Sequence, residues 1–311
     1  MIVTVTLNPA IDVTAGVGIL RVGSLNRLSD VVADIGGKGV NVSRTIAALG
    51  GRSIATGFAG GGAGAEIIRQ LAASEGIMPH FVPIAGSTRT NLKVIDHGGQ
   101  LTELNQPGPE IASGEISLLE GILTEASAQG AVVVIAGSAA PGLGEGYQAH
   151  LVRLVRQSGG IAVVDADGPA LRAAIEERPA LVKPNRHEIT QLFGAREDAS
   201  RDEVTGLVAE LLASGVERVV CSLGPTGALF GSSEGIIDFD GLVVPVASTV
   251  GAGDAMTAVL AMGLESGAEW GETARLAMAA ATAAVMTAGT RPPQRSDVDA
   301  LVNRFAPRDD V

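Results

Sequence analysis

Short apolar runs alternate with segments of helical periodicity along most of this chain of 311 residues, and this alternation constrains the fold more than any other feature. The expected strands are apolar at nearly every position, as strands covered on both faces are. They lie at residues 2–7, 53–58, 131–136, 161–165, 181–183 and 218–222. The expected helices lie at residues 40–49, 65–74, 116–128, 146–157, 169–176, 201–213, 252–265 and 272–287. Such βαβ alternation predicts an α/β fold, a parallel sheet with helices on both faces.

Two stretches interrupt this rhythm in the N-terminal half. Residues 12–34 and 89–105 alternate polar and apolar side chains around turn residues, which is typical of half-exposed strands. They predict a small β-sheet, acting as a lid, inserted into a single domain that spans residues 1–311. Near the C-terminus, three short runs predict antiparallel strands at residues 228–230, 235–239 and 242–246.

The charge of the chain limits its partners. With 34 acidic and 22 basic residues the formal net charge is −12, which argues against nucleic acid and against an anionic membrane surface. No apolar run reaches the ~20 residues that a membrane helix needs, and the sequence opens in a strand pattern without the basic region of a signal peptide. A single cysteine excludes an intramolecular disulfide framework. We therefore expect a cytoplasmic protein.

Only three of the 22 basic residues are lysines, namely Lys38, Lys93 and Lys183. Arginine is a planar fork, whereas lysine is a compact point charge on a thin stem. In a chain otherwise rich in arginine, the remaining lysines are candidates for positions that arginine cannot fill. The alternative is chance survival under a compositional bias.

The sharpest motif is the segment of residues 248–254, Ser-Thr-Val-Gly-Ala-Gly-Asp, which precedes a helical run. Small residues let the backbone approach a ligand, and the free N–H groups of a first helical turn bind an anion. A carboxylate there fits if Asp254 faces an attacking hydroxyl while the neighbouring amides stabilise a transferring phosphoryl group. The alternative is that Asp254 caps the helix and the glycines form a turn.

Two further turns follow expected strands. In residues 183–188, Lys-Pro-Asn-Arg-His-Glu, the spacing of Asn185 and Glu188 fits a helix capping box, or a site near Mg²⁺ bound through water and nucleotide phosphates. Residues 221–227, Cys-Ser-Leu-Gly-Pro-Thr-Gly, form a turn suited to nucleotide phosphates or ribose, or else a plain hairpin turn. Cys221 ends an apolar run, which predicts a buried and inert thiol.

A glycine loop with a lysine suits a phosphorylated polyol. Residues 35–41, Ile-Gly-Gly-Lys-Gly-Val-Asn, precede a helix but lack the spacing of a P-loop. With Asp12 they offer amides, an ammonium and a carboxylate. Arg89, in the segment Thr-Arg-Thr-Asn at residues 88–91, adds a fork for the phosphate.

Two other patterns carry less weight. Residues 60–65, Gly-Gly-Gly-Ala-Gly-Ala, fit a dinucleotide fingerprint, but no acidic residue follows about 20 positions on, so a nicotinamide or flavin site is not expected. The four histidines have no ligand spacing, which argues against a structural metal site.

Together these segments resemble the PfkB carbohydrate kinase family, of ribokinase-like fold, over nearly the whole chain. The resemblance implies ATP and Mg²⁺ as cofactors and a homodimer formed through the small sheet. It implies that Asp254 is the catalytic base and that Gly251, Ala252 and Gly253 form the anion hole. The nucleotide would be bound by Lys183, Asn185, Ser222, Gly224, Gly227 and Thr249. The magnesium would be bound, through water, by Asn185 and Glu188.

Residues 6–12, Thr-Leu-Asn-Pro-Ala-Ile-Asp, resemble the branch of that family acting on phosphorylated ketohexoses: 1-phosphofructokinase, tagatose-6-phosphate kinase and the minor 6-phosphofructokinase. For the sugar phosphate this branch implies Asp12, Gly37, Lys38, Asn41, Arg89, Asn91 and Ser138. The lysine within the glycines favours fructose 1-phosphate, whereas residues 56–64 and 289–291 are similar to the 6-phosphofructokinases. Residues 137–142, Gly-Ser-Ala-Ala-Pro-Gly, depart from the Leu-Pro that follows Gly-Ser in the family. A non-catalytic nucleotide-binding regulator is the remaining alternative, against which the retained Asp254 argues.

Overall fold

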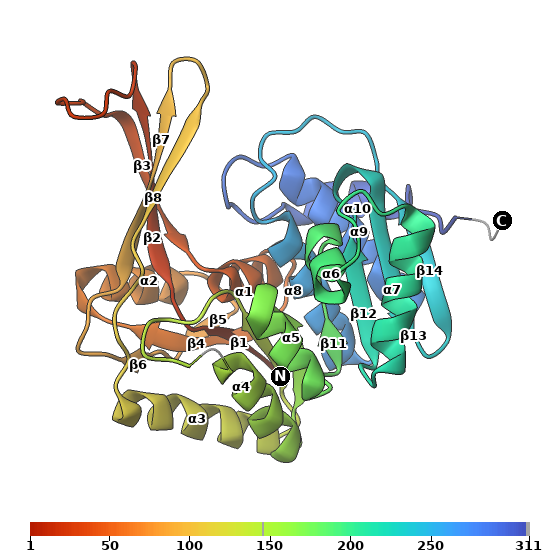
Figure 1. Cartoon of the computed structure of the whole chain (residues 1–311). Helices are drawn as coiled ribbons and strands as arrows, with labels where there is room; N and C mark the ends of the chain where they lie inside the picture. Colours follow the sequence, from red (N-terminus) through yellow and green to blue (C-terminus); the bar gives the residue numbers. More distant parts are fainter. Residues whose placement is uncertain (145, 309–311) are drawn as a thin grey trace.

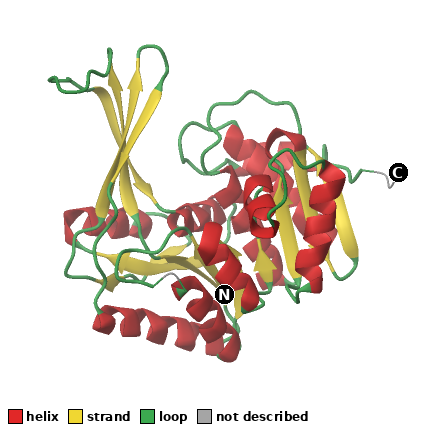
Figure 2. Cartoon of the chain, viewed as in Figure 1, coloured by secondary structure: helices red, strands yellow, loops and turns green. Residues whose placement is uncertain are grey.

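A computed structural model describes residues 1–144 and 146–308, most of which form a layered body around one large sheet (Figures 1 and 2). The strands of this sheet are β1 (Ile2–Thr6), β4 (Ser53–Ala59), β5 (Ile77–Pro79), β6 (Val82–Pro83), β9 (Val132–Ala136), β10 (Ile161–Asp165), β11 (Leu181–Val182), β12 (Arg218–Ser222), β13 (Gly227–Ser232) and β14 (Gly235–Asp240). Their order is β14-β13-β12-β11-β10-β9-β1-β4-β5, with β6 paired to β4. The pairs from β12 to β5 are parallel, and β13 and β14 add an antiparallel edge.

Helices cover both faces of the sheet because its central strands are apolar on both faces. In β9, Val133 and Ile135 belong to one core and Val132 and Val134 to the other. The first core lies under α3 (Ser113–Ala128), α4 (Tyr147–Gln157), α5 (Gly168–Glu176), α6 (Arg186–Phe193) and α7 (Arg201–Ala213). The second lies under α1 (Lys38–Ala48), α8 (Ala252–Ser266), α9 (Trp270–Val285) and α10 (Arg295–Val302), while α2 (Gly61–Ala72) covers β4 and β5. The predicted α/β fold is confirmed.

A second, small sheet stands away from the body, at the upper left of Figure 1. Its strands are β2 (Ala10–Val17), β3 (Ser29–Gly36), β7 (Arg89–Asp96) and β8 (Leu101–Asn105), in the order β3-β2-β7-β8. The central pair β2–β7 is parallel and the outer pairs are antiparallel. The prediction of a small separate sheet is therefore confirmed, and it joins the body where Ala10 and Arg89 pair.

Two expectations need correction in the C-terminal third. The strand predicted at residues 242–246 is wrong: residues 241–250 form a loop between β14 and α8. Val243 is 98% exposed, so its apolar side chain has no layer to pack against, and the edge of the sheet is β14. Helix α10 was not predicted, because only Val298 and Leu301 of its eight residues are buried and such a narrow apolar face gives a weak periodic signal.

The helix expected at residues 272–287 and the buried cysteine are confirmed. Helix α9 packs its small side chains in the second core, and within the described residues each helix is too short or too polar to span a membrane. Cys221 is fully buried on β12, where burial raises the pKa of its thiol to about 12. Such a thiol stays protonated at neutral pH and cannot serve as a nucleophile.

Candidate active site

A cavity of about 890 Å³ lies where the carboxyl ends of β1, β9, β10 and β12 meet the first turn of α8 and the base of the small sheet. In open parallel sheets ligands bind in this position, because loops from several strands converge there. All eighteen predicted site residues line this cavity: Asp12, Gly37, Lys38, Asn41, Arg89, Asn91, Ser138, Lys183, Asn185, Glu188, Ser222, Gly224, Gly227, Thr249, Gly251, Ala252, Gly253 and Asp254. The structure thus brings residues from across the chain to one place, and the role of each stays a prediction.

Asp254 lies in the first turn of α8 and is buried, with 8% of its surface exposed. It does not cap the helix: the N-cap residue is Gly251, and the helix start has no side-chain capping bond. The Nδ2 of Asn41, on α1, donates a hydrogen bond of 2.8 Å to Asp254 Oδ2. Burial, with the Asp165 carboxylate close by, raises the pKa of Asp254 to about 6, although Asn41 and two lysines act to lower it. A carboxyl with this pKa is suited to general-base chemistry near neutral pH.

Asp165, at the carboxyl end of β10, joins two of the three lysines. Its Oδ1 accepts a hydrogen bond of 2.9 Å from Lys38 Nζ, its Oδ2 lies 3.1 Å from Lys183 Nζ, and the Thr257 hydroxyl donates to Oδ2 at 3.0 Å. Burial alone would raise the pKa of Asp165, but the two ammonium groups hold it at about 2. The same contact holds the pKa of Lys38 above its usual value despite the burial of the ammonium group.

Asp165 was missed as a site residue by sequence reasoning. A signal was present, because Asp165 directly ends an apolar strand, and the carboxyl ends of parallel strands meet at one edge of a sheet. The residue lies in no glycine-rich motif, however, so no motif indicated it.

The third lysine also contacts an acidic residue of the cavity. Lys93 Nζ, on β7, lies 3.7 Å from Asp12 Oδ2, and Asn91 Nδ2 donates a hydrogen bond of 2.9 Å to Asp12 Oδ1. Strands β2 and β7 pair Asp12 directly with Asn91, which explains the contact. Each lysine of the chain therefore forms an ion pair with a carboxylate at or beside the cavity, and that arginine could not replace it there stays a prediction.

Several buried polar atoms around the cavity have no partner within the described residues. They are Thr6 Oγ1, Asn8 Oδ1, Asn41 Oδ1, Asn91 Oδ1 and Arg89 Nε. Arg89 uses its two other nitrogens on backbone carbonyls, at 3.1 Å from both Gln106 O and Asn8 O. Leaving buried donors and acceptors unpaired is costly, so their concentration here distinguishes this cavity as the candidate site.

Two turns, one at the start of α6 and one between β12 and β13, form another wall of the cavity, called the opposite wall below because it lies away from the small sheet. Asn185 Oδ1 accepts a hydrogen bond of 2.9 Å from Glu188 N, and Glu188 Oε2 accepts one of 2.8 Å from Asn185 N, so the predicted capping box is present at the start of α6. Burial raises the pKa of Glu188. The second turn, the 3₁₀ segment η1 (Gly224–Thr226), joins β12 to β13 as a hairpin. Both turns have their structural role and still line the cavity.

A parallel α/β sheet with a buried carboxylate at a helix start, beside the amides of that helix and the ammonium groups of Lys38 and Lys183, has the parts expected of a kinase that transfers a phosphoryl group to an alcohol. The chain belongs to the pfkB family of carbohydrate kinases, whose family model matches residues 4–297.

Individual relatives agree with this assignment. The chain is 38% identical over 299 residues to a 1-phosphofructokinase of Rhodobacter capsulatus, covering 94% of each chain. It is 33% identical to the tetrameric inhibited form of Escherichia coli phosphofructokinase-2, with a TM-score of 0.89 over 97% of this chain and 98% of that one. The structure of Arabidopsis thaliana ribokinase with ribose and ATP, at 20% identity and a TM-score of 0.78 over 97% and 98% of the two chains, shares the fold. The chain is therefore a sugar-phosphate kinase of the pfkB family.

Proposed function

We propose that this kinase phosphorylates the 6-hydroxyl of fructose 1-phosphate, using ATP and Mg²⁺ and releasing fructose 1,6-bisphosphate and ADP. The observation that carries the proposal is the buried Asp254 at the start of α8, next to the backbone amides of Gly251, Ala252 and Gly253. The substrate is favoured by the 1-phosphofructokinase relative and by Lys38 within its glycine loop.

The chemical step needs a base and an anion site side by side. The acceptor hydroxyl gives its proton to the Asp254 carboxylate as its oxygen bonds to the γ-phosphorus. The bond between that phosphorus and the β,γ-bridging oxygen breaks, and ADP leaves with the bond electrons. The amides at the start of α8, together with the positive end of the helix dipole, stabilise the charge on the transferring group.

The sugar phosphate would lie against the small sheet and α1. Arg89, which lines the cavity, and Lys38, which has further N–H donors besides the one on Asp165, would hold its phosphate. Its hydroxyls would be bound by Asp12, Gly37, Asn41, Asn91 and Ser138, which line this part of the cavity.

ATP would lie along the two turns of the opposite wall, against Lys183, Asn185, Ser222, Gly224, Gly227 and Thr249. The described residues contain no group of three or more His, Cys, Asp or Glu side chains that could hold a metal ion. A site with so few protein ligands suits Mg²⁺, because this ion keeps several waters and is bound by one or two side chains plus nucleotide phosphates. Asn185 and Glu188 would hold it through water, and the cation would neutralise phosphate charge when bound.

The second candidate acceptors are fructose 6-phosphate and tagatose 6-phosphate. They are favoured by the likeness to E. coli phosphofructokinase-2, and Thr290, within the segment similar to the 6-phosphofructokinases, lines the cavity. A coupled assay of ADP release over fructose 1-phosphate, fructose 6-phosphate, tagatose 6-phosphate and fructose separates them. We expect the highest kcat/KM with fructose 1-phosphate. A higher value with a 6-phosphate supports the second candidate, and ADP binding without turnover on any sugar supports a regulator.

A homodimer formed through the small sheet belongs to the same proposal. The two edge strands expose the apolar side chains of Val31, Val32, Leu101 and Leu104, each more than 45% exposed. Exposed apolar strand edges are sites of pairing between chains. Light scattering should give twice the chain mass of 31.3 kDa, and Leu104→Lys should shift the mass toward one chain.

A further inference from the structure

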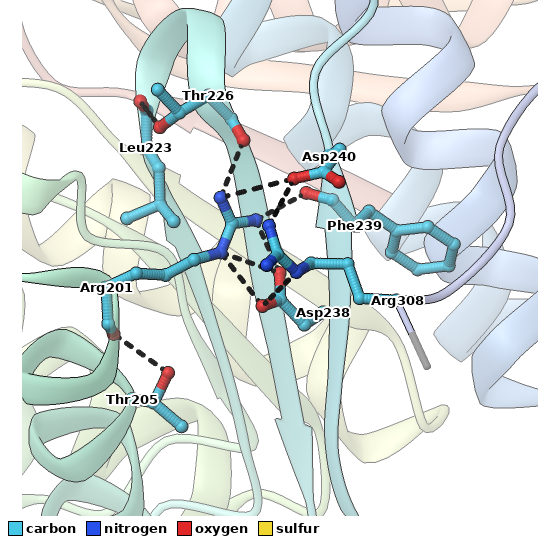
Figure 3. Close-up of polar contacts among 8 residues, drawn as sticks. All are labelled: Arg201, Thr205, Leu223, Thr226, Asp238, Phe239, Asp240 and Arg308. Carbon is cyan, nitrogen blue, oxygen red and sulfur yellow. Dashed lines mark hydrogen bonds and ion pairs between the residues drawn. The ribbon is translucent and has the colours of Figure 1, made fainter. Parts of the chain in front are cut away.

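Arg201, the first residue of α7, lies behind the wall of the cavity and does not line it. Figure 3 shows its guanidinium at the centre of a polar cluster. It donates a hydrogen bond of 2.8 Å from Nε to Asp238 Oδ2, and hydrogen bonds of 2.8 Å from Nη1 to Thr226 O and from Nη2 to Phe239 O. One planar group therefore holds a carboxylate and two backbone carbonyls, which requires the fixed fork of arginine.

The two carbonyls belong to the two backbones that form one wall of the cavity. Thr226 ends the turn η1, whose Gly224 and Pro225 line the cavity, and Phe239 lies at the end of β14, just before the cavity-lining loop of Gly241–Val244. These backbones are in direct contact. A Cβ on Gly227 would lie 1.9 Å from Phe239 O, and one on Gly241 would lie 2.0 Å from Pro225 O. Arg201 bridges this contact from the side away from the cavity.

Arg201 is itself firmly held. Ser200 and Glu203 form a capping box at the start of α7, and the Thr205 hydroxyl donates a hydrogen bond of 2.9 Å to Arg201 O (Figure 3). The Arg201 side chain is only 18% exposed, so its contacts are partly shielded from water. The cluster is extended by Arg308 of the C-terminal segment, which lies 2.7 Å from Asp240 Oδ1 and 3.6 Å from Asp238 Oδ2. Among the described residues, Arg308 makes no hydrogen bond or ion pair with the turn η1.

We infer that Arg201 is a positioning residue for nucleotide binding: it fixes the turn η1 against the end of β14, so that the cavity-facing backbone of both segments is set before the nucleotide arrives. This inference rests on the proposed function, because it takes that turn as part of the nucleotide site. Preorganised sites lose affinity when a supporting side chain is removed, since the ligand must then order the loop. The sugar-phosphate half of the cavity would be formed by α1 and the small sheet, and Arg201 makes no hydrogen bond or ion pair with either in the described part of the chain.

The test compares three variants by calorimetric binding of ADP with Mg²⁺ and, separately, of fructose 1-phosphate. Arg201→Gln removes the charge and the fork. Arg201→Lys keeps the charge beside Asp238 but cannot reach both carbonyls with one nitrogen, and it guards against a folding failure of the first variant. Arg308→Gln is the matched control, because it removes ion pairs with the same two aspartates and leaves the turn untouched.

Both Arg201 variants should bind ADP about tenfold more weakly, because small misplacements of a binding loop are costly. Their affinity for the sugar phosphate should stay within about twofold. Arg308→Gln should bind ADP like the unchanged protein, even if its melting temperature falls. Unchanged ADP affinity in Arg201→Lys would overturn the inference and leave the proposed function standing. The same holds if the Arg201 variants lose affinity for ADP and for the sugar phosphate equally. It also holds if Arg308→Gln loses as much ADP affinity as the Arg201 variants. If the unchanged protein binds no ADP, the proposed function fails with it.

Discussion

Asn41 donates a hydrogen bond of 2.8 Å from its Nδ2 to Asp254 Oδ2, although 213 positions separate the two residues in the chain. The first lies on α1 next to the small sheet and the second at the start of α8, so the bond ties the sugar side of the cavity to the proposed base. It orients the carboxyl group and leaves Oδ1 to receive a proton. The bond also acts to lower the pKa of Asp254, which burial raises to about 6.

The pH dependence of turnover should report this carboxyl group. The base acts only when ionised, so kcat/KM, which reports the groups of the unliganded enzyme, should be half-maximal near pH 6 and fall as the pH drops below that value. Asn41→Leu removes a hydrogen bond that favours the ionised form, so its midpoint should move to higher pH. Asn91→Leu is the control, because Asn91 binds Asp12 and not Asp254. A midpoint that does not move in Asn41→Leu would contradict the assignment of the base.

Asp165→Asn should destabilise the fold, because it leaves the ammonium groups of Lys38 and Lys183 without their charged partner. Removing one member of a buried ion pair costs about 3–5 kcal/mol, and the Lys183 and Asp165 side chains are 6% and 3% exposed. The measurement is urea unfolding at pH 7. Asp198→Asn, which removes a surface pair with Arg196, should leave the midpoint unchanged. Equal midpoints for both variants would show that the buried cluster contributes no stability.

The contribution of the same cluster to the free energy of unfolding should depend on pH. The pKa of Asp165 is held at about 2, below the ordinary value of 3.8, so its ionised form is favoured in the folded state. Its contribution to the free energy of unfolding is therefore complete above the ordinary value and disappears as the pH falls through about 2. The difference in stability between the unchanged protein and Asp165→Asn should shrink over that range.

Arg89→Gln should weaken binding of the sugar phosphate without affecting ADP. A hydrogen bond between charged groups contributes about 1.5–3 kcal/mol, so KM for fructose 1-phosphate should rise about 10–100-fold. Calorimetry with ADP should give an unchanged Kd. Unphosphorylated fructose is the control ligand, because it lacks the anion and should be bound equally poorly by both proteins. A KM that stays normal would place the phosphate elsewhere.

Gly227→Ala should disrupt the wall of the nucleotide side. Its φ is +118°, and a Cβ would lie 1.9 Å from the backbone oxygen of Phe239, which cannot move without displacing β14. We expect a lower melting temperature and weaker ADP binding. Gly224→Ala, in the same turn with φ +61° and open space around its Cβ, should cost only about 1 kcal/mol. Equal effects of the two substitutions would contradict this packing.

The fold and most of the cavity could be predicted from sequence, because each carries a local signal. The apolar runs predicted the strands β1, β9 and β10. The glycine-rich segments predicted the starts of α1 and α8, which line the cavity. Arg201 had no such signal, and Asp165 had only its place at the end of the apolar strand β10. Their importance comes from contacts with Lys38 and Lys183 in one case and with Thr226 in the other, and these contacts exist only once the sheet has assembled.

The loop that follows β14 shows the opposite case, in which the sequence carried a strand signal but no strand forms. Its valines have the composition of a strand, but residues 241–250 pair with no strand in the described part of the chain, and β14 is the edge of the sheet. Leu242, Val243 and Val244 line the cavity instead. Composition could not distinguish an apolar cavity wall from a strand, because both are rich in the same side chains.

The most direct test is the turnover of Asp254→Asn with fructose 1-phosphate and MgATP, measured beside its affinity for ADP. The substitution keeps the size of the side chain and removes the proton acceptor. We predict that kcat falls about 10²–10⁴-fold while the Kd for ADP stays within about twofold. Near-normal turnover of this variant would contradict the account, because the acceptor hydroxyl would then lose its proton to some other group.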